Sequence, residues 1–452
     1  MEDDGVPEVP LALVSNLYLE KKAFQVKQKS ILWEGYERAN LLTHAQVELI
    51  KAIDKQSPEQ VQAAVQEKGT AYASLILHLL QNLSRPDTVQ YVCVLTDTIL
   101  SGSDDNAKYF QQVASEGEGY PYGPFFKALE LNDEFTQLQA SKILTILACS
   151  SPNPGALDLT QLWQWIIQQL GSQHPEVVDL VTQEIESLLR VRQYRIPFWK
   201  TPHAMKELLK NLDKPSVTPQ MQYQIIFCLW LLTFEGEIAA NINRQYDIVP
   251  KLTEIAKAAV KEKVIRVAVA TLRNLVEKAP AENLAAMLVV KLLPFMENLG
   301  SRKWSDSDIL EDIDYVKERL QENFQSLTTF EQYASEIETG KLEWSPPHKS
   351  EAFWKENYSR LEEHNYQLLR ALARILSTST SPVILAVGAN DVGQYSKYAS
   401  KAGKRFLQDI GAKQRVMELM THEDSDVRYQ ALAAVQKYMH QAWLWIERIM
   451  GG

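Results

Sequence analysis

The sequence predicts an all-helical protein: an N-terminal armadillo/HEAT-like right-handed helical solenoid followed by a smaller, armadillo-like helical C-terminal domain. Apolar residues recur at i, i+3, i+4 and i+7 along most of the chain, which is the spacing of one helix face. The helices also repeat at intervals of 42 to 45 residues, and armadillo and HEAT repeats have periods of about 40–47 residues. No convincing run of strand-like alternation between hairpin turns is present.

Three stretches show the helical spacing clearly, so we expect their apolar side chains to face inward. They are Ala140, Ile143, Leu144 and Leu147; Tyr223, Ile226, Phe227, Trp230 and Leu231; and Val427, Ala431, Ala434, Val435 and Tyr438. Helix start signals agree. Ser57-Pro58-Glu59-Gln60 combines an N-cap, a first-turn proline and a capping-box glutamine, and Thr218-Pro219 and Ser381-Pro382 are cap-plus-proline starts.

The repeat is visible when one inward-facing anchor is taken from each long helix. The anchors are Cys93, Leu138, Val181, Ile226 and Ala268, separated by 45, 43, 45 and 42 residues. Shorter helices are expected before two of them, at Leu162–Ile167 and Met205–Leu209. Stacked helical hairpins bury apolar faces that one hairpin cannot bury alone. Val383 and Val427, 44 residues apart, indicate that the repeat resumes near the end.

The regular pattern lapses between about Gly300 and Ser350. Asp308–Phe324 can still form a helix there, but the pair Pro346-Pro347 cannot continue one. We therefore expect an N-terminal repeat domain over residues 1–340, a linker over 341–350 and a C-terminal helical domain over 351–452. Trp344, Ser345, Pro346 and Pro347 are the predicted interdomain linker residues.

Composition limits the function classes. The net charge of -10 argues against non-specific nucleic-acid binding. Residues 341–452 carry a net +3 and the rest of the chain -13, which suggests two separate docking surfaces. Three widely spaced cysteines in apolar runs indicate buried, reduced thiols in a cytosolic protein. The start lacks the signal-peptide pattern, and no apolar stretch approaches the roughly 20 residues that span a bilayer. Membrane association is therefore expected only through a partner.

A search for catalytic motifs finds none. Gly403-Lys404 lacks the earlier glycine of a phosphate-binding loop, and no H-E-x-x-H or zinc-ligand spacing occurs. We expect no catalytic, cofactor-binding or metal-binding residues and no small-molecule substrate. His422-Glu423-Asp424 is the one tight polar cluster that contains a histidine. It is either a metal or acid/base site or, as we favour, a polar turn that caps the helix beginning near Asp426.

One basic cluster is a candidate partner-binding site. Lys397, Lys401, Lys404 and Arg405 lie within nine residues, and the first three would share one helix face unless Gly403 ends the helix. The cluster is either solvated surface or a docking site for an acidic partner. In the pairs Trp163/Trp165 and Trp443/Trp445 one ring each is expected to be partly exposed, since residues at i and i+2 cannot both face inward.

At the predicted linker, Gly340–Trp354 (GKLEWSPPHKSEAFW) resembles the linker of the H subunit of the vacuolar-type proton-translocating ATPase (V-ATPase). Further segments are similar to that family in the same order along nearly the whole chain. They are Tyr223–Leu232, Val264–Lys278, Val387–Tyr395 and His422–Lys437.

The resemblance implies a non-catalytic regulatory subunit of the peripheral V1 sector. It implies that the N-terminal domain holds the peripheral stalk, which the E and G subunits form. The C-terminal domain is expected to contact either the membrane-sector stator, through the cytosolic part of the a subunit, or rotor and catalytic V1 subunits of the free sector. The implied outcomes are ATP hydrolysis coupled to proton transport in the assembled pump and silenced ATPase activity in the detached sector. The expected location is cytoplasmic, on the cytosolic face of vacuolar and other acidic compartments.

Two other functions fit the residues alone. Armadillo and HEAT folds also serve as transport adaptors and phosphatase scaffolds, because one fold hosts many functions. A helical hydrolase with an unrecognised site is the enzyme alternative. Cargo in a pull-down would favour the first, and nucleotide turnover by the purified protein the second.

Overall fold

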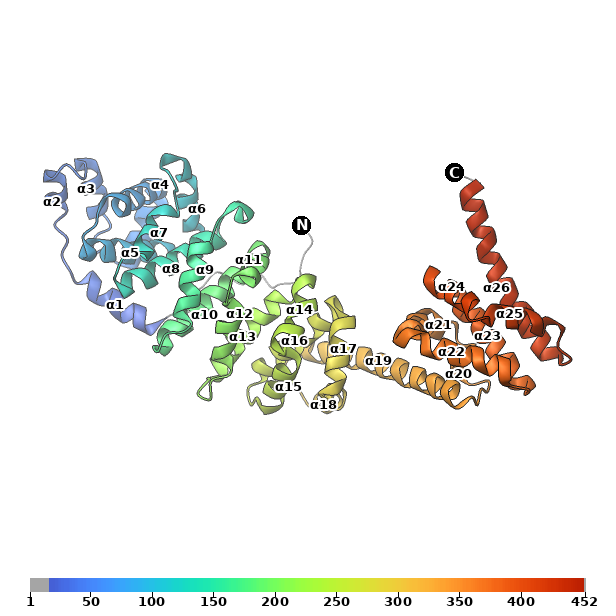
Figure 1. Cartoon of the computed structure of the whole chain (residues 1–452). Coiled ribbons are helices and arrows are strands. Elements are labelled where there is room, and N and C mark those ends of the chain that lie inside the picture. The colour runs from blue at the N-terminus through green and yellow to red at the C-terminus, as the bar shows by residue number, and fades with distance from the viewer. Residues whose placement is uncertain (1–15, 451–452) are drawn as a thin grey trace. The chain divides into compact units, whose positions relative to one another are not determined.

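The computed structural model describes residues 16–450, apart from the side chains of residues 326–328 and 439–450. Within this part of the chain every regular element is a helix, which confirms the predicted all-helical class. The chain divides into two compact units, Met1–Lys317 and Glu318–Gly452, and Figure 1 shows the order of their helices. The division falls inside α19 (Asp308–Thr339), the helix that contains the predicted segment Asp308–Phe324.

The α-helices of the first unit range from short to long. They are α1 (Leu17–Lys27), α2 (Trp33–Arg38), α3 (His44–Lys51), α4 (Pro58–Asn82), α5 (Pro86–Leu100), α6 (Ala107–Gln112), α7 (Gly123–Leu129), α8 (Glu134–Cys149), α9 (Thr160–Gln169), α10 (Pro175–Arg190), α11 (Arg195–Lys200), α12 (Ala204–Leu212), α13 (Pro219–Leu232), α14 (Gly236–Tyr246), α15 (Ile248–Ala258), α16 (Glu262–Lys278), α17 (Pro280–Val289) and α18 (Leu292–Gly300). Its short 3-10 helices are η1 (Asp104–Asn106), η2 (Ala114–Glu116), η3 (Pro154–Ala156) and η4 (Arg192–Tyr194).

The helices of the second unit follow α19. They are α20 (Pro346–Lys349), α21 (Glu351–Asn357), η5 (Tyr358–Glu362), α22 (Glu363–Thr378), α23 (Pro382–Tyr398), α24 (Lys401–Asp409), α25 (Ala412–Glu418), η6 (Leu419–Thr421) and α26 (Ser425–Met450).

The core of the first unit is a stack of long helices, one per repeat. α5, α8, α10, α13 and α16 pack against one another in that order. All five predicted anchors, Cys93, Leu138, Val181, Ile226 and Ala268, are at most 1% exposed. The predicted shorter helices are α9 and α12, which pack on the long helices α10 and α13. The repeat prediction is therefore confirmed in this unit.

The three predicted helix starts lie where the structure begins α4, α13 and α23. α4 begins at Pro58, and Ser57 with Gln60 forms a complete capping box. α13 begins at Pro219 with Thr218 as its cap. α23 begins at Pro382 as predicted, but the side chain of Ser381 makes no capping hydrogen bond, so the cap predicted there is wrong. Of the pair Trp163/Trp165, Trp163 is buried and Trp165 half-buried, as expected. The side chains of Trp443 and Trp445 lie outside the described part of the chain.

One predicted inward face is wrong in part. On α13, Ile226 and Leu231 are buried, but Tyr223, Phe227 and Trp230 are only half-buried. α13 is apolar around most of its circumference, because Ile225, Cys228, Leu229 and Leu232 fill the core beside the anchor. Helical spacing alone cannot tell which of two apolar stripes faces inward. The predicted face of α8 is buried throughout. The predicted face of α26 is buried at Val427, Ala431 and Ala434 and half-buried at Val435 and Tyr438.

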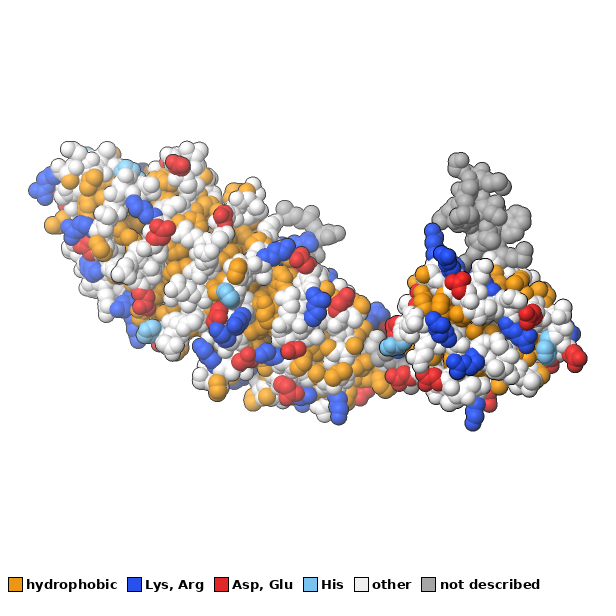
Figure 2. Space-filling model, in the orientation of Figure 1, with side chains coloured by type: hydrophobic (Ala, Val, Ile, Leu, Met, Phe, Trp, Pro, Cys, Tyr) orange, Lys and Arg blue, Asp and Glu red, His pale blue; other side chains and the backbone are white. Residues whose placement is uncertain are grey.

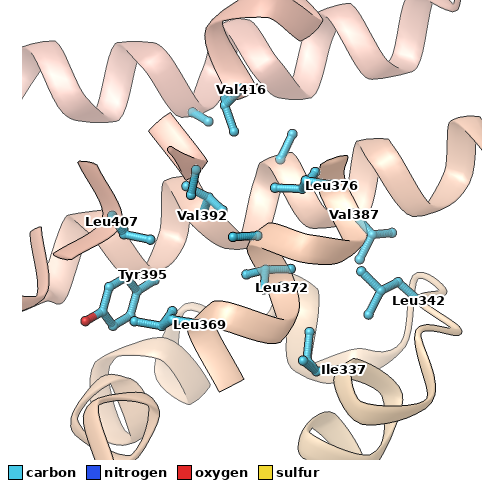
Figure 3. Close-up of a cluster of buried hydrophobic side chains, with 14 of the residues drawn as sticks. Ile337, Leu342, Leu369, Leu372, Leu376, Val387, Val392, Tyr395, Leu407 and Val416 are labelled. Carbon is cyan, nitrogen blue, oxygen red and sulfur yellow. The ribbon is translucent and has the colours of Figure 1, made fainter. Parts of the chain in front are cut away.

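The second unit has its own apolar core, shown in Figure 3. Leu369, Leu372 and Leu376 of α22 meet α23 and α25, and Val387 and Val392 of α23 are fully buried in the same core. α23 packs along α26, whose Val427, Ala431 and Ala434 are fully buried. Val383 is 48% exposed, so this predicted anchor is wrong. The inward positions near the start of α23 are instead Leu385, Ala386 and Val387.

The predicted linker residues lie within the second unit. Leu342 is buried beside Val387, and Trp344 packs half-buried against the same core. Pro346 is the first residue of α20, and Pro347 is buried, so the proline pair starts a helical turn. The compact units thus divide before the predicted linker, at Lys317/Glu318. A linker role for residues 341–350 stays a prediction.

Candidate docking surface

The basic helix α24 is fastened to the core of the second unit at its first turn. Ser400 caps α24 by accepting a hydrogen bond from the Gly403 amide at 2.9 Å. The Glu362 carboxylate accepts from the Ser400 hydroxyl at 3.0 Å and from the Tyr395 hydroxyl at 3.1 Å. A Cβ at Gly403 would lie 2.2 Å from the Tyr395 hydroxyl, so this close approach requires glycine. Leu407 anchors the next turn beside Tyr395 (Figure 3).

The structure divides the predicted basic cluster between two helices. Lys397 lies in the last turn of α23 and forms an ion pair with Glu351 of α21, which also accepts a hydrogen bond from the Tyr398 hydroxyl at 2.6 Å. Ala399 and Ser400 separate the two helices, so Lys397 does not share a helix with Lys401. Gly403 lies inside α24 and does not end it. On α24, Lys401 and Arg405 are exposed and Lys404 is half-buried.

Two further lysines join these cations from separate helices. Lys413 on α25 is close enough to Lys404 for their positive charges to repel each other. Lys437 on α26 and Lys397 repel each other in the same way. Lys413 Nζ also lies 5.6 Å above the Tyr438 ring. We call this set the basic surface: Lys397, Lys401, Lys404, Arg405, Lys413 and Lys437. Figure 2 shows Lys and Arg side chains spread over the visible face of the second unit.

Burial and mutual repulsion set the electrostatics of the basic surface. Burial lowers the pKa of Lys404. Burial also lowers the pKa of Lys413 and Lys437, and repulsion from Lys404 and Lys397 respectively lowers it further. The hydrogen bond that Lys397 donates to Glu351 instead raises the pKa of Lys397. Partly desolvated cations near one another favour an anionic partner, because its charge would relieve their repulsion.

The His422 cluster is a helix cap. Asp424 accepts hydrogen bonds from the amides of Asp426 at 2.9 Å and Val427 at 3.1 Å, at the first turn of α26. His422 accepts from the Asp424 amide at 3.0 Å. The favoured interpretation of this motif, a polar turn before a helix, is confirmed.

The described residues contain no group of three or more His, Cys, Asp and Glu side chains arranged to hold a metal ion. Among the same residues, no helix combines the length and apolarity needed to cross a membrane.

The first unit carries an aromatic row that periodicity misassigned to the core. Tyr223, Phe227 and Trp230 of α13 and Phe234 just beyond its end contact one another in sequence, with ring centroids 4.9 to 5.8 Å apart. The Arg190 guanidinium lies 4.8 Å from the Phe227 ring, within cation–π range. A half-buried aromatic row of this kind suits protein contacts, in which aromatic residues are enriched.

Stacked helical repeats, a second helical unit and a surface of clustered cations define the class of this protein, a helical-repeat scaffold. The family model for the N-terminal part of the V-ATPase H subunit matches residues 17–320, and the model for its C-terminal part matches residues 326–443. The chain therefore belongs to the V-ATPase H subunit family.

Similar proteins span almost the same length. The H subunit of the V-type proton ATPase of Drosophila melanogaster is 36% identical, over 94% of this chain and 90% of its own. A probable V-type proton ATPase H subunit of Oryza sativa subsp. japonica is 32% identical, over 91% of this chain and 95% of its own. The V-type proton ATPase H subunit of Dictyostelium discoideum is 30% identical, over 92% of this chain and 94% of its own.

Proposed function

We propose that this chain is a non-catalytic regulatory subunit in the V1 peripheral sector of a V-ATPase. The observation that carries the proposal is the match of the chain, in order, to both halves of the V-ATPase H subunit family. The relatives named for this subunit align over most of both chains, which supports a shared role for the whole protein. The helical-repeat fold adds support, because solenoids present extended surfaces to protein partners.

In this proposal the two units have different partners. The first unit holds the peripheral stalk of E and G subunits, and the second unit contacts the cytosolic part of the a subunit in the assembled pump. In the detached V1 sector the second unit contacts rotor or catalytic subunits and silences ATP hydrolysis. The protein reaches the cytosolic face of acidic compartments through these partners. A difference of about 1.4 kcal/mol between two docked states changes their ratio tenfold.

The basic surface is the part of the second unit that we assign to docking. Its six cations come from α23, α24, α25 and α26. Two carboxylates lie close to them: Glu351 interacts with Lys397 and Lys437, and Asp391 interacts with Lys437. Burial lowers the pKa of three of its lysines, which means that their charged form is destabilised. A nearby negative charge would stabilise that charged form. An acidic protein surface is the partner that this arrangement fits best.

Reconstitution tests the overall role. Membranes that contain a V-ATPase lacking this subunit should regain ATP-driven acidification when the full chain is added. Free V1 sector lacking the subunit should lose ATPase activity on the same addition. Acidification that stays at its starting level while the chain binds the complex would rule out the coupling role.

Charge reversal tests the basic surface. The triple variant Lys401→Glu, Lys404→Glu, Arg405→Glu should raise the concentration needed for half-maximal silencing of free V1 by about tenfold or more, because each reversal replaces attraction by repulsion. The matched control reverses three exposed cations on other elements of the second unit, namely Lys341, Lys355 and Arg374. Equal effects of both variants would mean that net charge, and not this surface, determines docking.

A further inference from the structure

A buried histidine in the second unit is held between two carboxylates. His348 of α20 is fully buried, as is Asp391 of α23, and Glu336 of α19 is 18% exposed. His348 Nδ1 lies 2.8 Å from Asp391 Oδ2, and His348 Nε2 lies 2.8 Å from Glu336 Oε2. Glu336 and Asp391 are 12 and 43 positions from the histidine in the chain. One imidazole ring therefore joins three helices.

The geometry of this network requires an additional proton. A neutral imidazole has one N–H donor, and an ionised carboxylate has none. Two short contacts from one ring to two carboxylates therefore need a proton on both ring nitrogens or on one carboxyl group. The ordinary pKa of an imidazole, about 6.5, is well above that of a carboxyl group, about 4. Burial raises the pKa of Asp391, but Asp391 and Glu336 also raise the pKa of His348, so we place the proton on the ring. The closed network is then an imidazolium between two carboxylates.

The network positions the segment that precedes α21. The Asn390 side-chain amide donates to the main-chain carbonyl of His348 at 2.9 Å, which fastens the α20 backbone directly to α23. The Tyr333 ring packs against the imidazole, with centroids 5.3 Å apart. Trp344, next to α20, lines an open depression together with His348 and Asn390. The order of residues 344–349 thus depends on bonds made at His348.

We propose that His348 is a proton-operated clamp that holds residues 344–349 against α19 and α23 when protonated and loosens them when it loses its proton. Loss of one N–H would bring a ring lone pair to 2.8 Å from a carboxylate oxygen, which is repulsive. The ring can no longer satisfy both Glu336 and Asp391, so one of the two helices loses its contact with α20. This inference goes beyond the proposed function, because it makes the order of this segment depend on pH.

The charged groups around His348 determine the direction of the effect. Burial by itself lowers the pKa of His348, but Asp391 and Glu336 outweigh it and raise that pKa above its ordinary value of 6.5. Tyr333 faces the ring from α19, and Lys349 and Asp426 lie at the rim of the adjoining depression. Lys437 of α26 lies close enough to Asp391 for their charges to interact. The folded segment therefore holds more protons than the open one. Its stabilisation is complete below about pH 6.5 and is lost as the pH rises through the raised pKa.

The state of the ring can be measured directly by nitrogen NMR of the full chain labelled at histidine. We expect His348 to change from two N–H groups to one at a pH above about 6.5. An imidazole that keeps one N–H from about pH 5 to about pH 9 would overturn the proposal. Glu336→Gln removes one carboxylate charge but keeps an acceptor oxygen, and it should lower the pH of this transition. The variant therefore tests the network without deleting the histidine.

Hydrogen exchange tests the clamp itself. Between about pH 6.5 and the raised pKa, opening of residues 342–354 should increase up to about tenfold per pH unit after correction for the intrinsic exchange rate. His348→Gln should exchange faster at the lower end of this range and show no remaining pH dependence. His422→Gln, which replaces a histidine of the helix cap before α26, should behave as the unchanged chain. Corrected exchange that is flat with pH in the unchanged chain would show that His348 does not act as a clamp.

Discussion

The side-chain amide of Asn283 on α17 donates a hydrogen bond to the main-chain carbonyl of Ala239 on α14, 44 residues earlier, at 3.0 Å. Asn211 on α12 bonds in the same way to the carbonyl of Leu170, at the end of α9, 41 residues earlier. Both bonds are buried and both span one repeat. Buried polar contacts therefore help to fix the register of neighbouring repeats, which apolar burial alone specifies weakly.

Replacing Asn283 with alanine should destabilise the first unit by about 2 kcal/mol, because Asn283 also donates to the carbonyl of Ala279 and the vacated volume is buried. Urea unfolding of the full chain measures the loss. Asn241→Ala is the matched control, since Asn241 lies nearer the surface and donates within α14, to the Glu237 carbonyl. Its effect should stay within about 0.5 kcal/mol. Equal losses of unfolding free energy in the two variants would mean that the hydrogen bond between repeats does not contribute to stability.

The repeat architecture could be predicted because each repeat buries its long helix in the same way. Regular separations between anchors such as Leu138 and Val181 follow from that uniform packing. Prediction failed where one helix carries two apolar stripes. Trp230 has the spacing of a core residue, yet it is half-buried because Leu229 and Leu232 already fill the adjacent core positions. Which stripe lies inward depends on neighbouring helices, which local spacing does not record.

The basic surface could be predicted only where its residues are close together in the sequence. Lys401, Lys404 and Arg405 fall in one short segment, so a local pattern reveals them. Lys413 and Lys437 come from two other helices, so no local pattern links them to the cluster. The His348 network is harder still, since Glu336 and Asp391 resemble ordinary surface acids in the sequence and only the packing of the second unit brings them to one ring.

Glu184→Gln should stabilise the first unit increasingly as the pH rises. Burial raises the pKa of Glu184 to about 8, although the Ser141 hydroxyl, 2.9 Å away, opposes the shift. The folded state therefore binds more protons than the unfolded state between about pH 4.5 and pH 8, and stability falls with pH over that interval. Glutamine does not titrate, so the gain should be near zero at about pH 4 and roughly 3 kcal/mol at about pH 7.

Denaturation curves at about pH 5, 7 and 8 measure this difference. Glu176→Gln, at the exposed start of the same helix, leaves Glu184 in place and should therefore keep the pH dependence of the unchanged chain. A gain from Glu184→Gln that is constant across these pH values would mean that packing, and not the buried acid, is responsible.

The cysteines should react slowly with thiol reagents in the native protein. Burial raises the pKa of Cys93 and Cys149 to about 12 and that of Cys228 well above its ordinary value. The thiolate is the reactive form, and its fraction at about pH 8 is then about one part in ten thousand. Labelling with a chromogenic disulfide should show no fast phase before denaturation and three thiols after it. A fast labelling phase that disappears in Cys149→Ser would contradict the prediction. It would show that Cys149, the half-buried cysteine, reacts readily in the native protein.

A strained turn supports the basic helix α24. His364, Asn365 and Tyr366 all have left-handed backbone angles, with φ of 47°, 55° and 58°. This conformation costs roughly 1–2 kcal/mol for each residue with a side chain, and less for asparagine. The turn places the Tyr366 ring against Phe406 of α24, with centroids 4.2 Å apart. The strain is therefore offset in part by a contact that holds the helix carrying Lys401 and Arg405.

His364→Gly should consequently stabilise the second unit by about 0.5–1 kcal/mol, because glycine adopts these angles freely and the exposed histidine ring is expendable. Tyr366→Gly relieves similar strain but loses the stack on Phe406, so it should destabilise α24. Native-state hydrogen exchange of α22 and α24 distinguishes the two effects. Slower exchange in His364→Gly with faster exchange of α24 in Tyr366→Gly is the expected pair of results. Faster exchange in both variants would mean that the left-handed turn is not strained.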